Sequence, residues 1–385
     1  MYKRVLFSTK WYEMRVHQGV LDYAQRHGWD VISSHHMPES AFNIPALDGQ
    51  IVEIGPNDRR RRQLTEAFPG PVVGLEDFGA GLEVPRVHTD NYAVGCLAAE
   101  HFLERGFRRF ATLCRADYAY VRDRLRGFHD TIGGMNGGLP CLDIKLKTFW
   151  SDTNHVGKEY RASSLQKLLA IDRPAGVFCV DDDDAAGLIR SLIKRNVSIP
   201  EEIAVVGVNN DPLTCPYGLV PITSIDPGFE NIGYRAAELL DRMMQGKHIP
   251  PKTHLVPPRG LVVRRSSDIR AVEDLQVARA LRFIWDHPEN RKAVADIAAH
   301  VKLPIRTLQW RFNKAMGYSL QDEVTKLRIE RIKERLIQSD KSIRQIADEM
   351  DFSSVQYLIR LFRKETGVSP LKFRRQHKPN PPAVA

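Results

Sequence analysis

Short apolar runs alternate with amphipathic segments along the first 265 residues, and this alternation constrains the fold more than any other feature of the sequence. Several runs are almost continuously apolar, as expected for parallel strands that are covered on both faces. The pattern therefore predicts a doubly wound α/β fold. The predicted strands are residues 4–9, 30–35, 50–54, 72–75, 109–114, 175–180 and 203–208. The predicted helices are residues 15–27, 92–105, 121–132, 185–195 and 230–245.

The alternation weakens between residues 115 and 120. A single sheet of 265 residues would be unusually long, so we expect two successive lobes with parallel sheets and a cleft between them. Ligands in such sheets bind beyond the carboxyl ends of the strands. The residues that follow each predicted strand are therefore candidates for a binding site.

Acidic, amide and aromatic residues follow three of these strands and a further short segment, residues 84–88. They are Trp11 and Tyr12, Asp90 and Asn91, Asp181 to Asp184, and Asn209 to Asp211. Carboxylates and amides bind sugar hydroxyls, and aromatic rings cover the apolar face of a sugar. Other roles remain open at single positions. Asp183 or Asp184 could cap a helix, Trp11 could pack at a lobe edge, and Arg124 could be an exposed helix charge.

Residues 1–265 resemble the sugar-binding core of the LacI/GalR regulators and of periplasmic sugar-binding proteins. The resemblance implies that Asp90, Arg124, Asp181, Asp182 and Asn209 contact a sugar and that Trp150 stacks on it. Asn209 stands where an Asp is more usual in the family. The segments that carry the resemblance are residues 89–95, 124–128, 180–187, 205–210, 233–240 and 260–266.

The excess of positive charge lies in the last part of the chain. Residues 271–385 hold 22 Lys and Arg against 14 Asp and Glu, whereas the whole chain has a net charge of only +9. A nearly neutral body with a basic terminal segment indicates a polyanionic partner. Solubility alone is the competing explanation of this charge.

The basic segment contains an internal repeat. Ile297-Ala298, Phe312, Lys314, Gly317 and Ser319 recur, after an offset of 49 to 50 residues, as Ile346-Ala347, Phe362, Lys364, Gly367 and Ser369. Each copy predicts a helix–turn–helix motif. In the second copy we expect helices at 342–350 and 353–364, a turn at Asp351 and an N-cap at Ser353.

A long helix is predicted at residues 320–338, between the two copies. Its apolar positions Val324, Leu327, Ile329, Ile332 and Leu336 can pack on both copies. The linker would fix two outward-facing helices so that they enter successive major grooves of DNA, about 34 Å apart.

Residues 272–376 resemble the AraC/XylS family of DNA-binding domains, chiefly through Ile346-Ala347, Phe352, Phe362 and Ser369-Pro370. Two residues depart from the family pattern, because Asp351 replaces the usual Gly and Trp310 stands where Arg is frequent. Trp can contact a thymine methyl group but cannot form a bidentate pair with guanine. The resemblance implies that bases are contacted by Arg306, Gln309, Trp310, Gln356, Tyr357 and Arg360.

A sugar-binding body joined to a C-terminal AraC-type domain resembles the regulators of bacterial xylose operons. We therefore expect a sugar domain at 1–265, a linker at 266–273, a DNA-binding domain at 274–376 with two helix–turn–helix motifs, and a disordered tail at 377–385. The resemblance implies D-xylose as effector, operator DNA and RNA polymerase as partners, a homodimer, and activation of transcription. Repression, or a response to another pentose, remains open.

Other classes of function lack support in the sequence. The Walker motif, the Gly-x-Ser-x-Gly motif and the His-Glu-x-x-His motif are missing, so a sensor is favoured over an enzyme. The five cysteines and the pair His35-His36 lack metal-ligand spacing, and we expect neither a metal nor a cofactor. The start of the chain lacks the features of a secretion signal, and the scattered cysteines fit a reducing, cytoplasmic location.

Overall fold

The computed structural model describes residues 2–36, 46–55, 58–75, 83–114, 118–134, 138–145, 162–287 and 293–377. Two compact units divide the chain, an α/β unit at Met1–Asp268 and a helical unit at Ile269–Ala385. Among the described helices, none combines the length and the apolar character that crossing a bilayer requires. Trp150 and the predicted tail from residue 378 onward lie outside the described residues.

The first lobe of the α/β unit is a six-stranded sheet in the order β11-β5-β4-β3-β1-β2, and its strand pairs are all parallel. Its strands are β1 (Lys3–Ser8), β2 (Trp29–Ser33), β3 (Gly49–Val52), β4 (Val72–Leu75), β5 (Arg86–Thr89) and β11 (Thr253–Val256). Its helices are α1 (Met14–His27), α2 (Arg59–Glu66) and α8 (Phe229–Met244).

The second lobe is a six-stranded sheet in the order β12-β10-β9-β8-β6-β7, in which only β12 is antiparallel to its neighbour. Its strands are β6 (Phe110–Cys114), β7 (Cys141–Lys145), β8 (Ala175–Cys179), β9 (Ile203–Val208), β10 (Thr223–Asp226) and β12 (Gly260–Val262). Its helices are α3 (Asn91–Glu104), α4 (Ala119–Gly133), α5 (Ala162–Leu169), α6 (Asp182–Ile193) and α7 (Thr214–Tyr217).

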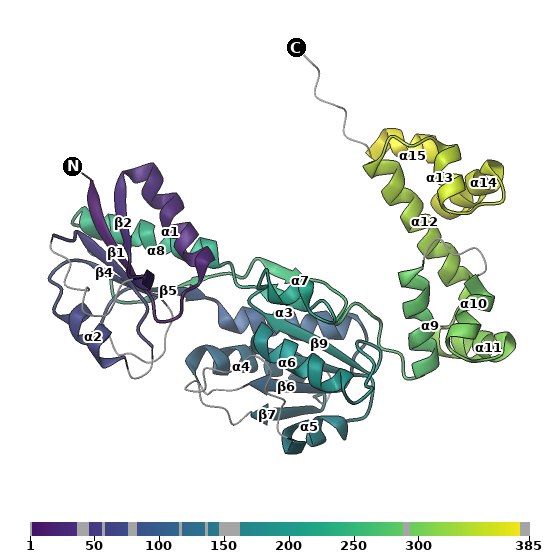
Figure 1. Cartoon of the computed structure of the whole chain (residues 1–385), viewed down its shortest axis with the longest axis horizontal. Helices are drawn as coiled ribbons and strands as arrows, with labels where there is room; N and C mark the ends of the chain where they lie inside the picture. Colours follow the sequence, from purple (N-terminus) through teal and green to yellow (C-terminus); the bar gives the residue numbers. More distant parts are fainter. Residues whose placement is uncertain are drawn as a thin grey trace, which may run out of the picture. The chain divides into compact units, whose positions relative to one another are not determined.

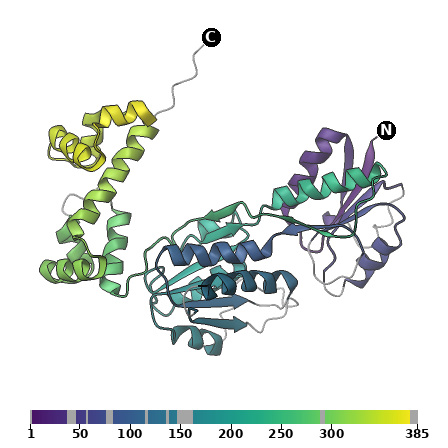
Figure 2. The ribbon, with the colours of Figure 1, turned by 180° about the vertical axis from the view of Figure 1, so that it is seen from behind.

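The chain passes between the lobes three times, between β5 and α3, between β10 and α8, and between β11 and β12 (Figures 1 and 2). The two-lobe α/β fold is confirmed, but the prediction of successive lobes with a break near 115–120 is wrong. The first passage comes already at Asp90, and α8 and β11 return to the first lobe afterwards. Gly228 lies at the second passage with φ of 77°, a conformation that favours glycine.

Glycines allow pairs of helices to pack with their backbones in contact in both lobes. A Cβ atom on Gly95 of α3 would lie 1.9 Å from the carbonyl oxygen of Arg124 in α4, and one on Gly127 would lie 2.0 Å from that of Tyr92. Gly19 of α1 and Gly233 of α8 form the same arrangement in the first lobe. These crossings fix the helices that carry the residues of the cleft.

The helical unit consists of two groups of helices at the two ends of one long helix, α12 (Leu320–Gln338), which was predicted (Figure 1). The buried apolar residues of α12 are Leu320, Val324, Ile329, Ile332 and Leu336, whereas Leu327, which was also predicted to pack, is only half-buried. The first group is α9 (Leu275–Asp286), α10 (Ala293–His300) and α11 (Ile305–Met316). The second group is α13 (Ile343–Glu349), α14 (Val355–Thr366) and α15 (Pro370–His377).

The repeat predicted from sequence is present in three dimensions. Leu308 and Phe312 of α11 are fully buried, and so are Leu358 and Phe362 of α14. Asp351 has φ of 49°, which confirms its predicted role in the turn, and Lys302 has φ of 55° at the equivalent place of the first copy. The N-cap of α14 is Ser354 and not Ser353, because the Ser354 Oγ accepts the backbone N–H of Tyr357.

Candidate functional site

A cavity of about 350 Å³ lies between the two lobes of the α/β unit. Side chains of both lobes form its wall, from the loop after β1, from the start of α4 and from the ends of β8 and β9. The lining residues are Trp11, Tyr12, Glu13, Glu53, Tyr118, Tyr120, Arg124, Asp181, Asp182, Asp183, Asn209, Asp211 and Phe229. Carboxylates and aromatic rings thus converge on one space at the carboxyl ends of strands.

Arg124 is a buried residue of the cavity wall and not an exposed helix charge. Its Nε atom donates to Asn91 Oδ1 at 2.9 Å, and one of its terminal nitrogens donates to the carbonyl oxygen of Val180 at 2.6 Å. Its guanidinium lies 5.1 Å from the ring centre of Tyr120. Because these contacts fix the guanidinium in position, it is a preorganised donor for a ligand oxygen.

Asp181 begins α6 and has two roles. Its Oδ1 accepts the backbone N–H of Asp184 at 2.7 Å, which makes Asp181 the N-cap of the helix, and its side chain also lines the cavity. The helix cap therefore falls on Asp181 and not on Asp183 or Asp184. Asp183 lies at the exposed start of α6, whereas Asp184 is buried.

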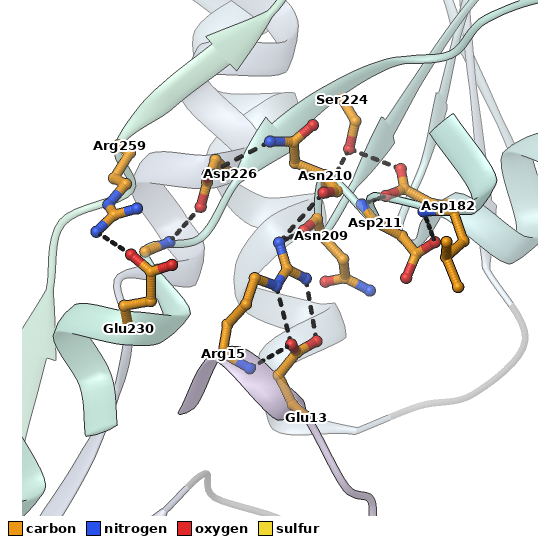
Figure 3. A network of polar contacts seen from close by, with 12 residues as sticks. Glu13, Arg15, Asp182, Asn209, Asn210, Asp211, Ser224, Asp226, Glu230 and Arg259 are labelled. Carbon is orange, nitrogen blue, oxygen red and sulfur yellow. Dashed lines mark hydrogen bonds and ion pairs between the residues drawn. The ribbon is translucent and has the colours of Figure 1, made fainter. Parts of the chain in front are cut away.

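Asp182 is a buried carboxyl beneath the cavity. It accepts hydrogen bonds from the Ser224 hydroxyl at 2.6 Å and from the backbone N–H of Asp211 at 2.9 Å (Figure 3). Burial raises the pKa of Asp182 to about 7, against these hydrogen bonds, which lower it. The contacts connect α6 to the turn after β9, so Asp182 holds two parts of the cavity wall together.

Trp11 and Tyr12 follow β1, as predicted, and both line the cavity. The backbone N–H of Trp11 donates to Glu53 Oε2 at 2.9 Å. The hydroxyl of Tyr12 is hydrogen-bonded to His17 Nδ1 at 2.9 Å, and its ring stacks on His35 at 3.9 Å. His17 and His35 therefore hold the Tyr12 ring, and Glu53 holds the Trp11 backbone, all within the first lobe.

Six of the eight residues predicted to contact a sugar come together in this cavity: Trp11, Tyr12, Arg124, Asp181, Asp182 and Asn209. Asp90 is not among the lining residues. It lies at the first passage between the lobes, where its Oδ1 caps α3 by accepting the N–H of Ala93 at 3.0 Å. Trp150 belongs to a part of the chain outside the described residues.

The cavity also includes residues that the sequence analysis did not select. Glu13 directly follows Tyr12, and Tyr118 and Tyr120 fall in the segment that we had interpreted as the break between lobes. Tyr118 and Tyr120 follow β6, so the rule of strand ends could have identified them. Glu53 directly follows β3, but the predicted strand at 50–54 included it, so the rule of strand ends missed it. Phe229 carries no such signal, because it lies at the start of α8 in the first lobe.

The helical unit presents a different kind of surface. On α11 and α14 the side chains opposite the buried Leu and Phe residues are exposed, and they include all six residues predicted to contact bases. Trp310 is 63% exposed, an unusual fraction for its type, and Lys314 lies over its ring at 5.2 Å. The exposed residues in question are Arg306, Gln309, Trp310, Gln356, Tyr357 and Arg360.

Two family models match the chain. Residues 99–267 match a periplasmic binding protein-like domain, and residues 297–376 match a helix-turn-helix domain. Together with the cavity between two lobes and the repeated helical motif, these matches define a sugar-responsive, DNA-binding transcription regulator with an AraC-type domain at its C-terminal end.

The relatives of the chain include xylose operon regulatory proteins. The chain is 25% identical to that of Haemophilus influenzae over 385 residues, which covers 95% of this chain and 96% of the relative. It is 26% identical to that of Escherichia coli K12 over 376 residues, which covers 95% of each. The structure of a xylose-binding transcription activator matches with a TM-score of 0.69 and 24% identity, covering 98% of this chain and all of the other.

Proposed function

We propose that the cavity binds D-xylose and that the chain activates genes of xylose use. The observation that carries this proposal is the cavity itself, in which aromatic rings and carboxylates converge from two lobes. The relatives named for a xylose operon support the choice of sugar. In the proposal the protein acts in the cytoplasm as a homodimer, binds operator DNA and assists RNA polymerase.

The proposed sugar contacts are of two kinds, hydrogen bonds to hydroxyl groups and stacking of aromatic rings. Arg124 donates to a hydroxyl or the ring oxygen, while Asp181, Asp182 and Asn209 accept or exchange hydrogen bonds with hydroxyl groups. Trp11 and Tyr12 cover the apolar face of the ring. Asp90 and Trp150 remain predictions from the resemblance alone.

The charges of the cavity support a neutral ligand. Among the residues that the structure describes, six acidic side chains line it, Glu13, Glu53, Asp181, Asp182, Asp183 and Asp211, against a single Arg124. An anionic sugar would lose its hydration beside negatively charged side chains. The positive charge in the cavity wall is too small to compensate for that loss. A neutral pentose has no such penalty.

Isothermal titration calorimetry with D-xylose, L-arabinose, D-ribose and D-xylonate tests this proposal. We expect D-xylose to bind most tightly and D-xylonate, which adds a carboxylate, to bind at least 100-fold more weakly. Binding of D-xylonate as tight as that of D-xylose, or binding of none of the neutral sugars, would contradict it.

The proposed DNA contact is made by α11 and α14. Both helices begin after a turn and expose Arg and Gln side chains, which suit guanine and adenine in the major groove. The helix α12 between them has 19 residues and is therefore about 28 Å long, close to one turn of DNA. This length supports binding of the two motifs to successive grooves of one duplex face.

Arg360→Ala is expected to weaken operator binding by roughly 1–3 kcal/mol and to relax the preference at one base pair. The arginine lies on the exposed face of α14, where a bidentate contact with guanine is possible. The measurement is fluorescence anisotropy on operator duplexes substituted at each position. Arg331→Ala serves as the matched control, because Arg331 is exposed on α12 and pairs with Glu334. Equal losses on every duplex would identify Arg360 as a phosphate contact instead.

A further inference from the structure

Arg15 joins the two lobes at the edge of the cavity (Figure 3). It belongs to the first turn of α1 in the first lobe, and one of its terminal nitrogens donates to the carbonyl oxygens of Asn209 and Asn210 in the second lobe, at 2.9 and 3.1 Å. We define these two hydrogen bonds as the interlobe bridge. Asn209 lines the cavity, so the bridge ends on a residue of the binding site.

The first lobe holds the Arg15 guanidinium on two sides. Its Nε and its second terminal nitrogen donate to the two carboxylate oxygens of Glu13 at 2.8 and 3.0 Å. The ring of Phe229 lies 4.8 Å from the guanidinium carbon. A planar guanidinium with a bidentate partner loses little further freedom when it binds a third group. Arg15 is therefore oriented by residues that themselves line the cavity.

The second lobe holds the turn that Arg15 contacts. Asn209 and Asn210 have φ of 112° and 47°, in the region that side chains other than glycine rarely adopt. Ile225, Ser224 and Arg264 fix the turn from within the lobe, through hydrogen bonds to Asn209 N, Asn210 N and Asn210 Oδ1. The carbonyl oxygens of Asn209 and Asn210 are directed to Arg15, across the cleft.

The electrostatic surroundings favour this position of a cation. Burial lowers the pKa of Arg15. The carboxylates of Glu13, Asp226 and Asp211 raise it by more than burial lowers it, so that the net shift of this pKa is upward. The guanidinium is thus charged and partly buried, and hydrogen bonds from a charged donor are strong in such a place.

We propose that Arg15 is a positioning residue of the sugar site, which holds the lobes together and shapes the Asn209–Asn210 turn before the sugar binds. This inference rests on the proposed function, and it adds a residue that does not itself line the cavity. A preformed site binds more tightly because less order has to be imposed by the ligand. Without the bridge, sugar binding also has to order the two lobes, and the measured affinity for the sugar is lower.

The test compares Arg15→Met and Arg15→Lys with the parent in the full chain. Met keeps an unbranched apolar stem and removes all donors, whereas Lys keeps the charge and loses the planar fork. Arg26→Met is the matched control, because Arg26 is exposed on the same helix and packs only over the ring of Tyr234 among the contacts that the structure gives it. Hydrogen exchange of the peptide that covers residues 209–214 reports the turn, and calorimetry with D-xylose reports the site.

We expect Arg15→Met to increase the exchange of this peptide without sugar and to weaken D-xylose binding at least tenfold. Arg15→Lys should fall between the parent and Arg15→Met, and Arg26→Met should match the parent. Parent-like exchange in both Arg15 variants overturns the bridge, and faster exchange with unchanged sugar affinity overturns the positioning role. If the parent binds no pentose, the proposed function fails, while the exchange experiment still decides whether the bridge exists.

Discussion

Gly95→Val is expected to unfold the second lobe at a markedly lower temperature and to abolish sugar binding. The first atom of any side chain at this position would lie 1.9 Å from the carbonyl oxygen of Arg124 and 2.6 Å from the backbone nitrogen of Phe128. Both are backbone atoms of α4, so the two helices would have to separate. Forcing atoms into a packed interior commonly costs about 1–3 kcal/mol, and a backbone clash of this size belongs at or above the upper end.

Thermal unfolding of the parent and the variant measures this effect, and calorimetry with D-xylose measures its consequence for Arg124, which α4 carries into the cavity. Gly133→Ala is the matched control, because Gly133 ends α4, the helix against which Gly95 packs, and an added Cβ there would meet nothing within 4 Å. The control is expected to melt close to the parent or slightly above it, since alanine favours a helix over glycine. A Gly95→Val variant that melts like the parent would refute the close packing of α3 and α4.

Asp182→Asn is expected to stabilise the α/β unit at pH 8 and to flatten its response to pH. Burial raises the pKa of Asp182 to about 7, from the value of 3.8 expected in the unfolded chain. Between these two values the folded unit keeps a proton that the unfolded chain has released, so stability falls as the pH rises. For this one group the loss is on the order of 4 kcal/mol by pH 8. Asparagine can still accept the N–H of Asp211 and donate to the Ser224 hydroxyl, without a charge to bury.

Urea unfolding of parent and variant at pH 4.5, 6 and 8 checks this expectation. The difference in free energy of unfolding between the two should grow with pH in favour of Asp182→Asn. Asp183→Asn is the control, because the neighbouring Asp183 is exposed and its replacement should leave the pH dependence unchanged. Parallel pH curves for the parent and Asp182→Asn would mean that the carboxyl is ionised in the folded unit throughout this range.

Much of the α/β unit could be predicted because its strands are buried on both faces. The segments Val72–Leu75 and Ile203–Val208 are continuous apolar runs, and both were predicted with the bounds that the structure shows. The order of the lobes could not be predicted in the same way. Strands and helices of the two lobes have the same pattern, and nothing local marks α8 or β11 as segments that return to the first lobe.

The candidate sites also contain residues that the sequence predicts and residues that it does not. In the helical unit, the repeat predicts both the buried face and the exposed face of α11 and α14, because an α-helix has one fixed period. In the cavity, most of the residues that follow strands were predicted, although Glu53, Tyr118 and Tyr120 were missed. Phe229 and Arg15 were not predicted either. Both lie on helices of one lobe and reach the site only because the two lobes face each other, which is a matter of tertiary structure.

The central claim is that a sugar bound between the lobes controls how the helical unit binds DNA. The most direct measurement is the affinity of the full chain for its operator, selected from genomic fragments, by fluorescence anisotropy with and without D-xylose at fixed salt. The account predicts that saturating D-xylose changes the operator affinity at least tenfold and leaves the affinity for a random duplex of equal length unchanged. Identical operator affinity with and without D-xylose, in a chain that calorimetry shows to bind the sugar, would contradict it.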